Sequence, residues 1–431
     1  MDVRNPDSGI GGASLPQATA DRPSAVFRIA LRLLDAGARL GMARFPDPDD
    51  ETGLRALGPR PSADGAEEGL RRLLRALAAE SRLTGFGALA LRHDLKRLLR
   101  NAAHVERVAA EAARAGTDAV PAPLFILGLP RSGTTFLHGL LAADPGNHVL
   151  RVWQTMDPRP RPASFRPETD RTVRRVERQL RMFARFAPDF PSVHPIGADS
   201  PQECSEITAH VFQSLRFDTI YRIPSYLDWL DDRGHLSAFA FHRKYLVCLQ
   251  QGLPEARWVL KCPDNTFALP EILSVYPDAR FVIVHRDPLR VCASVAYLTE
   301  VLRRPFLAGV DAGEIGRQVT GRWIEGARRL LSFDCAPGVP AERRINIHYA
   351  DLVADPLATV RRIYRHFGFA LGSEAETAMR AEVAARPGGG YREGRRYALD
   401  RFGIRPAALA EEFRAYRDHF GVGGATGLAP R

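Results

Sequence analysis

The stretch that decides the fold is Pro123-Leu-Phe-Ile-Leu-Gly-Leu-Pro-Arg-Ser-Gly-Thr-Thr-Phe-Leu-His-Gly-Leu-Leu141. It predicts a buried strand, a loop bounded by glycines and the start of a helix, the arrangement that binds phosphate groups. Gly128 and Gly133 have the spacing of a nucleotide P-loop, yet Thr134 stands where such a loop carries its lysine. Kinases and NTPases use that lysine on the β- and γ-phosphates. Its absence suggests a loop that binds phosphate without cleaving a triphosphate.

Several side chains of this loop are candidate anion ligands. The backbone N–H groups of residues 128–135 and the N-terminus of the following helix are expected to form the site. Hydroxyl groups and a guanidinium can add to it. The candidate ligands are Arg131, Ser132, Gly133, Thr134 and Thr135. A plain glycine turn between strand and helix is the weaker alternative, because strand, glycines, arginine and hydroxyls coincide.

The overall composition suggests an anionic partner. The chain has 431 residues, 45% of them apolar, and a net charge of +10. Such a charge does not separate nucleic acid, lipid headgroups and phosphorylated small molecules, and it also fits an arginine-rich surface without function. Only Lys96, Lys244 and Lys261 are lysines. The first two are expected at the surface, whereas Lys261 ends the apolar run 258–260.

No metal site, disulfide framework or membrane segment is expected. Five cysteines form no C-x-x-C pair, and no H-x-x-x-H spacing occurs. The N-terminus lacks the apolar core of a signal peptide. No apolar run approaches the ~18 residues that would span a bilayer, so a cytoplasmic protein is expected, with peripheral membrane contact left open.

The chain divides into three parts by composition. Residues 1–24 are rich in Gly, Pro, Ser and Asp and predict a disordered N-terminus. Residues 25–120 have helical apolar spacing and predict a helical N-terminal extension. In residues 121–425, short apolar strands alternate with helical segments. This alternation predicts an α/β fold, a P-loop-type three-layer sandwich with a central parallel sheet flanked by helices. The candidate strands are Leu124–Leu127, Arg257–Lys261, Phe281–His285 and Ile345–Tyr349.

Charged residues follow two of these strands. Lys261 stands at the carboxyl end of its strand, where ligands bind in open α/β sheets, and could neutralise charge on a leaving phosphate. A surface lysine with a buried stem is the alternative. Arg286 follows the strand 281–285, and Ser294 lies about two helical turns further on. The turn at Asp287 could let both address one anion, although Arg286 could instead pair with Asp287.

Taken together, these three elements resemble the sulfotransferase superfamily, whose members use 3′-phosphoadenosine-5′-phosphosulfate (PAPS). In that family a Gly-x-Pro-[RK]-Ser-Gly-Thr-Thr loop binds the 5′-phosphosulfate, which here corresponds to Gly128–Thr135. The resemblance implies that Lys261 assists transfer and that Arg286 and Ser294 bind the 3′-phosphate. Residues 347–356 also resemble the family's Tyr-x-Asp-Leu-x-x-x-Pro stretch. The loop is closest to the bacterial and tyrosylprotein-type branch, and the resemblance covers roughly residues 120–420.

The catalytic base departs from the family pattern. Cytosolic relatives have a histidine soon after the strand-end lysine, but here Cys262 and Pro263 follow it. The glutamate of the tyrosylprotein branch has no counterpart in residues 150–154. Glu203 is therefore the first candidate base and His194 the second. Glu203 could equally serve as a first-turn helix residue that favours the helix dipole.

A late basic loop closes over the 3′-phosphate in several family members. Arg395 and Arg396 lie in a glycine-containing basic stretch and could do the same, or could belong to a solvated loop. PAPS would be the co-substrate, without a metal, and a small-molecule or lipid hydroxyl or amine the acceptor. Two other functions remain. A P-loop kinase or NTPase would be expected to have lysine at position 134. A non-catalytic protein that binds nucleic acid or anionic lipid is also conceivable, but no interleaving of aromatic and basic residues supports nucleic acid.

Overall fold

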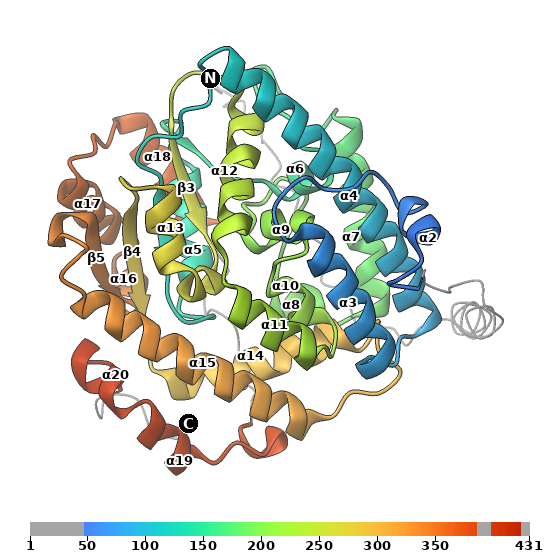
Figure 1. Ribbon diagram of the computed structural model, residues 1–431. Helices are drawn as coiled ribbons and strands as arrows, with labels where there is room; N and C mark the ends of the chain where they lie inside the picture. The colour runs from blue at the N-terminus through green and yellow to red at the C-terminus, as the bar shows by residue number, and fades with distance from the viewer. Residues whose placement is uncertain (1–46, 386–397, 424–431) are drawn as a thin grey trace, which may run out of the picture.

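The computed structural model describes residues 47–385 and 398–423 and has a parallel sheet at its centre (Figure 1). The sheet has five strands in the order β2-β3-β1-β4-β5. The strands are β1 Leu124–Leu127, β2 Asn147–His148, β3 Arg257–Lys261, β4 Arg280–His285 and β5 Arg344–His348. The four strands predicted from sequence are confirmed, and only the polar two-residue β2 was not anticipated.

Alternate residues of β1 face two separate hydrophobic layers. Leu124 and Ile126 pack with helices α5, α16, α17 and α18, whereas Phe125 and Leu127 join the larger core beneath α12, α13 and α15. Because a parallel sheet buried on both faces needs apolar residues at every position, β1 is a continuous apolar run. Helices therefore cover both faces of the sheet, and the predicted three-layer α/β sandwich is confirmed.

The helices have the following bounds. Before and around β2 they are α2 Glu51–Arg55, α3 Ala66–Glu80, α4 Gly85–Arg114, α5 Thr134–Ala142, α6 Val152–Met156, α7 Arg171–Phe186 and α8 Phe190–Val193. Between there and β3 they are α9 Ser205–Thr208, α10 Arg216–Ile220, α11 Pro224–Arg233 and α12 Leu236–Gln250. The rest are α13 Leu269–Val275, α14 Pro288–Arg303, α15 Ala312–Cys335, α16 Tyr349–Ala354, α17 Pro356–Phe367, α18 Ser373–Ala384, α19 Pro406–Glu412 and α20 Arg414–Phe420.

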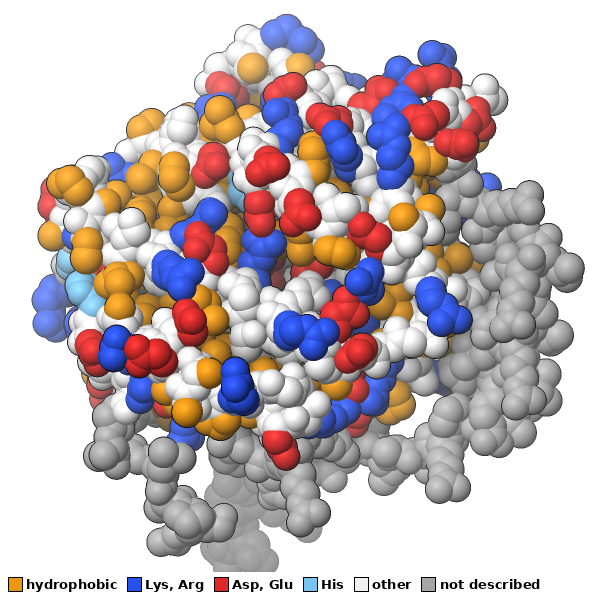
Figure 2. Space-filling view, turned by 60° about the horizontal axis from the view of Figure 1, so that its bottom comes forward, with side chains coloured by type: hydrophobic (Ala, Val, Ile, Leu, Met, Phe, Trp, Pro, Cys, Tyr) orange, Lys and Arg blue, Asp and Glu red, His pale blue; other side chains and the backbone are white. Residues whose placement is uncertain are grey.

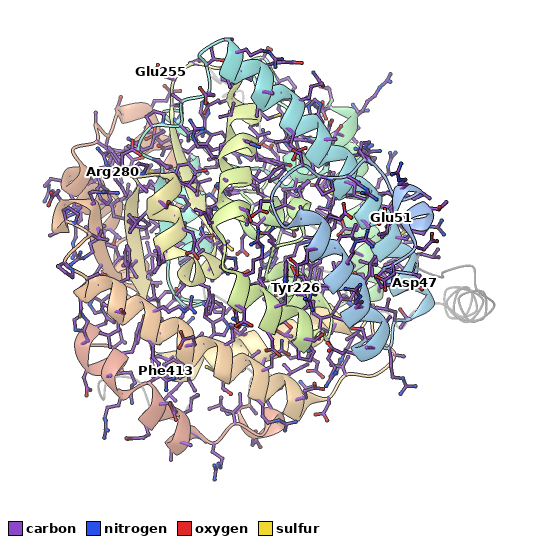
Figure 3. The ribbon with its side chains drawn as sticks, in the orientation of Figure 1. Asp47, Glu51, Tyr226, Glu255, Arg280 and Phe413 are labelled. Atoms are coloured by element: carbon purple, nitrogen blue, oxygen red, sulfur yellow. The ribbon has the colours of Figure 1, made fainter. Side chains whose placement is uncertain are left out.

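Helices α3 and α4 share one hydrophobic core with the helices over the sheet. Figure 3 labels Tyr226 of α11 in this helical layer. Its hydroxyl donates to the carbonyl oxygen of Phe212 at 2.9 Å. Arg216 adds a charged link, since it contacts Asp94 of α4 at 2.7 Å and Glu206 of α9 at 2.8 Å. A charge buried in this way is tolerated only when it is paired. The helical region before residue 120 is thus fixed to the segment that carries Glu203.

The C-terminal helix α20 covers the carboxyl end of β4. Nδ1 of His285 lies 2.7 Å from the Tyr416 hydroxyl, and the ring of Phe420 stacks on His285 at 3.8 Å. Burial lowers the pKa of His285 to about 4, so its ring is neutral at pH 7. Helix α19 lies directly before α20, from which only Phe413 separates it.

The predicted disordered N-terminus, residues 1–24, lies outside the described residues, as do the first residues of the predicted helical extension. Within the described ranges, no helix is both long enough and apolar enough to cross a membrane. On the face drawn in Figure 2, basic and acidic side chains are interspersed among apolar ones.

Candidate functional site

The carboxyl ends of β1, β3 and β4 meet at one edge of the sheet. Strand β1 lies between the other two, with Ile126 beside Lys261 of β3 and Leu127 beside Ile283 of β4. After β1 the chain forms β2 and β3 on one side of it and later adds β4 on the other side. The switch point of the topology therefore lies at the carboxyl end of β1. Ligands of open α/β sheets bind at such a point.

The loop between β1 and α5 depends on two glycines. Gly128 has φ +140°, and a Cβ there would lie 2.4 Å from the carbonyl oxygen of Val284 in β4. Gly133 has φ +94°, and its Cβ would lie 2.7 Å from the ring of Tyr349. Any side chain at either position would push the loop away from β4 or α16. Arg131 also has a positive φ, 64°, which is uncommon for a residue with a Cβ.

The N-terminus of α5 is lined by hydroxyl groups. The helix begins at Thr134 after Gly133 and is nine residues long. Thr134 is buried, whereas Thr135 is exposed. Ser132 is fully buried, and its Oγ atom has no hydrogen-bond partner among the described residues. Because buried hydroxyls are normally paired, this Oγ, the α5 N-terminus and the two glycines form a cradle that fits a phosphate-like anion.

Lys261 is buried behind this cradle. Only 3% of its side chain is exposed, so the surface alternative considered for it is wrong. Its Nζ atom donates to Oγ1 of Thr135 at 3.1 Å and to the carboxylate of Glu203. Lys96 and Lys244 are exposed, as the sequence predicted. The one buried lysine among the three therefore lies directly beside the loop.

Arg286 and Ser294 lie on the other side of the loop, and Arg131 joins them. Nη1 of Arg286 donates to the carbonyl oxygen of Arg131 at 2.8 Å, and Nε of Arg131 donates to Oγ of Ser294 at 3.1 Å. The Arg286 guanidinium also stacks over the ring of Tyr349 at 4.3 Å. Asp287 caps α14 by accepting from the N–H of Leu289 at 3.2 Å. The structure thus brings the predicted ligands Arg131, Arg286 and Ser294 into one group.

Glu203 and His194 both lie next to Lys261. Helix α9 begins at Ser205, so the expectation that Glu203 belongs to the first turn of a helix is wrong. Instead, the backbone N–H of Cys204 donates to the carbonyl oxygen of Lys261 at 3.3 Å, which holds Glu203 beside the lysine.

The charges around these two residues fix their protonation at neutral pH. Burial would raise the pKa of Glu203, but the Lys261 ammonium outweighs it and the pKa is lowered. Burial lowers the pKa of His194 to about 4, with the charge of Glu203 opposing and that of Lys261 adding to the effect. At pH 7, therefore, Glu203 is ionised and His194 is neutral, and each is able to accept a proton.

Comparison with known proteins identifies the family. Residues 123–372, more than half of the chain, match the model described as "Sulfotransferase family". The chain belongs to the sulfotransferase family.

Two curated relatives are both named omega-hydroxy-beta-dihydromenaquinone-9 sulfotransferase Stf3, one from Mycobacterium bovis and one from Mycobacterium tuberculosis. Each is 27% identical over 270 residues, which cover 57% of this chain and 62% of the relative. The match thus spans less than two thirds of the length of these relatives.

Two solved mycobacterial sulfotransferases share the fold. STF1 from Mycobacterium tuberculosis H37Rv superimposes with a TM-score of 0.72 and 28% identity, covering 89% of this chain and 98% of that one. STF9 from Mycobacterium avium gives a TM-score of 0.77 and 26% identity, covering 86% and 95%. These shares exceed the 57% aligned with Stf3, so the fold common to this chain and STF1 includes part of the helical region before β1.

Tyr349 and Asp264 are site neighbours to which the sequence analysis gave no role. Tyr349 packs beneath Gly133 and Arg286. It could have been identified in the sequence from the Tyr-x-Asp-Leu stretch, of which it is the first residue. Burial raises the pKa of Asp264 to about 7, and the charge of Glu203 adds to the rise. The only indication of Asp264 in the sequence was its position, as a carboxylate three residues after Lys261.

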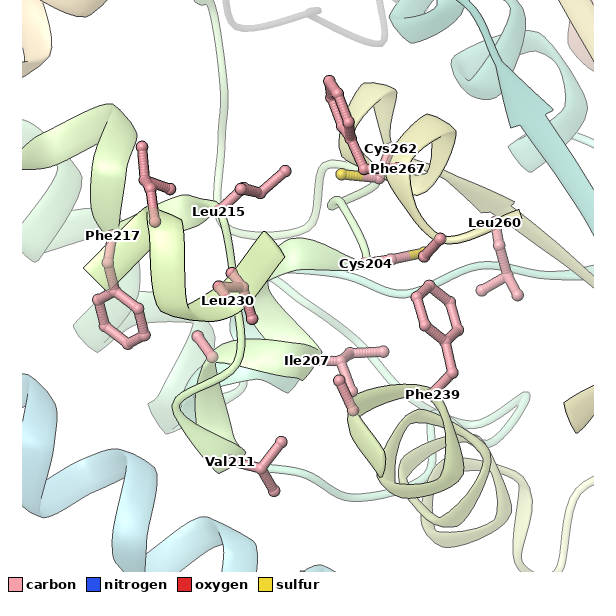
Figure 4. Close-up of a cluster of buried hydrophobic side chains, with 14 of the residues drawn as sticks. Cys204, Ile207, Val211, Leu215, Phe217, Leu230, Phe239, Leu260, Cys262 and Phe267 are labelled. Atoms are coloured by element: carbon pink, nitrogen blue, oxygen red, sulfur yellow. The ribbon is translucent and has the colours of Figure 1, made fainter. Parts of the chain in front are cut away.

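Asp264 lines a small pocket behind Glu203. The pocket also has Asn265, Ser205 and Phe239 in its wall, and the Nδ2 atom of Asn265 has no acceptor among the described residues. Figure 4 shows a cluster of buried apolar side chains in this region, among them Cys204, Ile207, Phe239 and Leu260.

Arg395 and Arg396, the predicted lid residues, lie outside the described residues. Across residues 47–385 and 398–423, no group of three or more His, Cys, Asp or Glu side chains could hold a metal ion.

Proposed function

We propose that this sulfotransferase-family protein transfers the sulfuryl group of PAPS to a hydroxyl group of a small-molecule or lipid acceptor. The observation that carries the proposal is the position of Lys261. Its ammonium contacts Thr135 at the N-terminus of α5, inside a glycine loop that has no lysine of its own. A charge placed there can neutralise the leaving phosphate without belonging to a triphosphate-cleaving loop.

The two sides of the loop support PAPS as the donor. On one side, Ser132, Thr134, Thr135 and the α5 N–H groups fit a 5′-phosphosulfate. On the other side, the group of Arg131, Arg286 and Ser294 fits a 3′-phosphate, because guanidinium forks bind phosphate oxygens in pairs. Tyr349 holds the plane of Arg286 from below. Arg395 and Arg396 are proposed as further 3′-phosphate ligands from the sequence alone.

The proposed reaction is an in-line displacement at sulfur. Glu203, with His194 as the second candidate, takes the proton of the acceptor hydroxyl as the new oxygen–sulfur bond forms. The bond between sulfur and the bridging oxygen of the 5′-phosphate breaks, and its electron pair stays on that oxygen. Lys261 and the loop N–H groups stabilise the resulting charge. The products are a sulfate ester and adenosine 3′,5′-bisphosphate.

The acceptor is proposed to be an alcohol, small or lipid-like. The curated relatives are named for an omega-hydroxylated menaquinone, and this supports a lipid alcohol here. The carboxyl group of Asp264, on which the charge of Glu203 acts, is a further polar group near the proposed base.

A ligand panel tests the proposal. Adenosine 3′,5′-bisphosphate is expected to bind tightly without metal, whereas ATP with Mg²⁺ binds weakly. Incubation with labelled PAPS and an extract of the producing cells should then yield a sulfated product in mass spectrometry. Preferential binding of ATP with Mg²⁺ would instead indicate a nucleotide kinase.

A further inference from the structure

Helix α7 carries a stripe of arginines along one side. The exposed residues of its 16-residue span are Arg171, Arg174, Arg175, Arg178, Arg181, Met182 and Arg185. At about 100° per residue, all seven fall within an arc of about 120°. The opposite side holds Val173 and Val176, which are buried in a small core with Trp153. The arginine stripe, as we name these six arginines, therefore faces outward along the whole helix.

The arginine stripe is not neutralised by the residues that the structure describes. None of its six guanidiniums forms an ion pair with a carboxylate in residues 47–385 or 398–423. Glu177, the one acidic residue of α7, is turned aside and accepts from the backbone N–H of Ala198. Some exposed arginines elsewhere are paired, for example Arg107 with Glu111 at 2.8 Å and Arg328 with Glu412 at 3.0 Å.

The stripe lies close to the candidate site along the chain. Helix α8 and then His194 follow α7, and the ring of Phe190 in α8 lies 5.6 Å from that of His194. Phe186 at the end of α7 stacks on Phe86 of α4 at 3.8 Å, which fixes this end of the helix to the body of the protein. A partner bound to α7 would thus be held beside the segment that leads into the site.

We propose that the arginine stripe of α7 docks the protein on an anionic lipid bilayer. Guanidiniums that have no carboxylate partner among the described residues are spread over about 24 Å of helix and match a flat layer of lipid phosphates, to which each basic residue near the surface adds attraction. Met182 is 54% exposed within the stripe, and an apolar side chain there can enter the headgroup layer but gains nothing on a nucleic-acid backbone. The docking itself is independent of the proposed function. Its use, to reach a membrane-held acceptor, rests on that function.

The test compares two variants of equal charge. The stripe variant carries Arg174→Gln, Arg175→Gln, Arg178→Gln and Arg181→Gln. The control variant removes four exposed but ion-paired arginines elsewhere: Arg72→Gln, Arg107→Gln, Arg328→Gln and Arg380→Gln. Both lose four positive charges. Binding to vesicles of phosphatidylcholine with and without 30% phosphatidylglycerol is measured by co-sedimentation at low and physiological salt, with a DNA duplex as competitor.

Wild type and the control variant are expected to bind the anionic vesicles alike and the neutral vesicles hardly at all. The stripe variant should bind at least tenfold more weakly. Equal losses in both variants, or no binding by wild type, would overturn the proposal, as would DNA bound in preference to vesicles. The affinity of every variant for adenosine 3′,5′-bisphosphate is measured in parallel. Intact nucleotide binding without vesicle binding refutes docking alone, and vesicle binding without nucleotide binding refutes the proposed donor alone.

Discussion

The two sides of the glycine loop use different cations in different surroundings. Lys261 is a compact ammonium, almost fully buried and paired with Glu203. Arg286 is a planar guanidinium that is stacked on Tyr349 and bonded to the loop backbone. Lysine is a point charge that can follow a developing charge, whereas arginine presents a fixed fork that recognises a group already formed. The difference suggests that chemistry is concentrated on the β3 side and nucleotide recognition on the β4 side.

The largest effect is expected from Lys261. In Lys261→Ala the leaving phosphate loses its neutralising charge, so kcat should fall by about 10²–10³-fold. The Kd for adenosine 3′,5′-bisphosphate should rise by a much smaller factor, because this product carries the same 5′-phosphate but is also held by the loop and by Arg286. Lys261→Arg should not restore activity, because a fork cannot replace a buried ammonium. Steady-state kinetics and calorimetry measure both quantities, with the exposed Lys244→Ala as the control. If Lys261→Ala weakened nucleotide binding and left kcat unchanged, the proposed division between chemistry on the β3 side and recognition on the β4 side would be wrong.

The second largest effect is expected from Glu203, again on turnover. Glu203→Gln removes the proton acceptor and should lower kcat by about 10²-fold, as expected for a general base. The exposed Glu255, which precedes β3 and is labelled in Figure 3, gives a matched Glu→Gln control. Near wild-type turnover in Glu203→Gln, with folding and PAPS binding intact, would exclude Glu203 as the base.

The pH profile distinguishes the two candidate bases, Glu203 and His194, from Asp264. A base must be deprotonated, and Glu203 has a lowered pKa while that of His194 is about 4. With either residue as base, kcat/KM should stay level from pH 8 down to about 5. A decline that begins near pH 7 would instead point to Asp264, whose pKa is about 7.

Arg286 should affect recognition more than turnover. Arg286→Ala is expected to weaken adenosine 3′,5′-bisphosphate by about 10-fold or more, the worth of a charge-assisted hydrogen bond, while AMP binding changes little. Ser294→Ala should show a smaller loss in the same direction. Isothermal titration compares the two ligands, with the exposed Arg328→Ala as control. Equal losses of affinity for adenosine 3′,5′-bisphosphate and for AMP would show that Arg286 does not bind the 3′-phosphate.

The smallest effect concerns stability around Asp264. Its folded-state pKa is raised to about 7, so the folded state binds the proton more tightly than the unfolded chain does. The associated stability is present at pH 4 and is lost as the pH rises through 7. Asp264→Asn should therefore raise the melting temperature at pH 8 by about 3 °C, with no gain at pH 4. A gain of equal size at both pH values would contradict the raised pKa.

The longer strands and the glycine loop could be predicted because the residue patterns that identify them lie within short stretches of sequence. An apolar run with glycines at fixed spacing identifies β1 and the cradle within twenty residues. Lys261 and Arg286 each follow such a run directly, and the parallel sheet brings their strand ends together. Strand β2 could not be predicted, since two polar residues carry no hydrophobic pattern.

The pairing of Glu203 with Lys261 could not be derived from spacing. The two residues are 58 positions apart, and they meet because the chain returns along β3 and bonds through Cys204. A carboxylate near a helix start is explained equally well by a favourable interaction with the helix dipole, so from the sequence alone that role was as probable for Glu203 as the role of a base. The titration of Asp264 likewise depends on burial among residues from distant segments.

The Lys261–Glu203 pair has a kinetic consequence. One ammonium cannot hold both the carboxylate and the donor's phosphate fully, so arrival of the donor loosens the pair. If Glu203 is the base, its release from the lysine would make it a stronger base only when the sulfuryl group is already in place. The expected order of addition is therefore donor before acceptor. Without the donor, Glu203 would stay paired with Lys261 and would not take a proton from an alcohol.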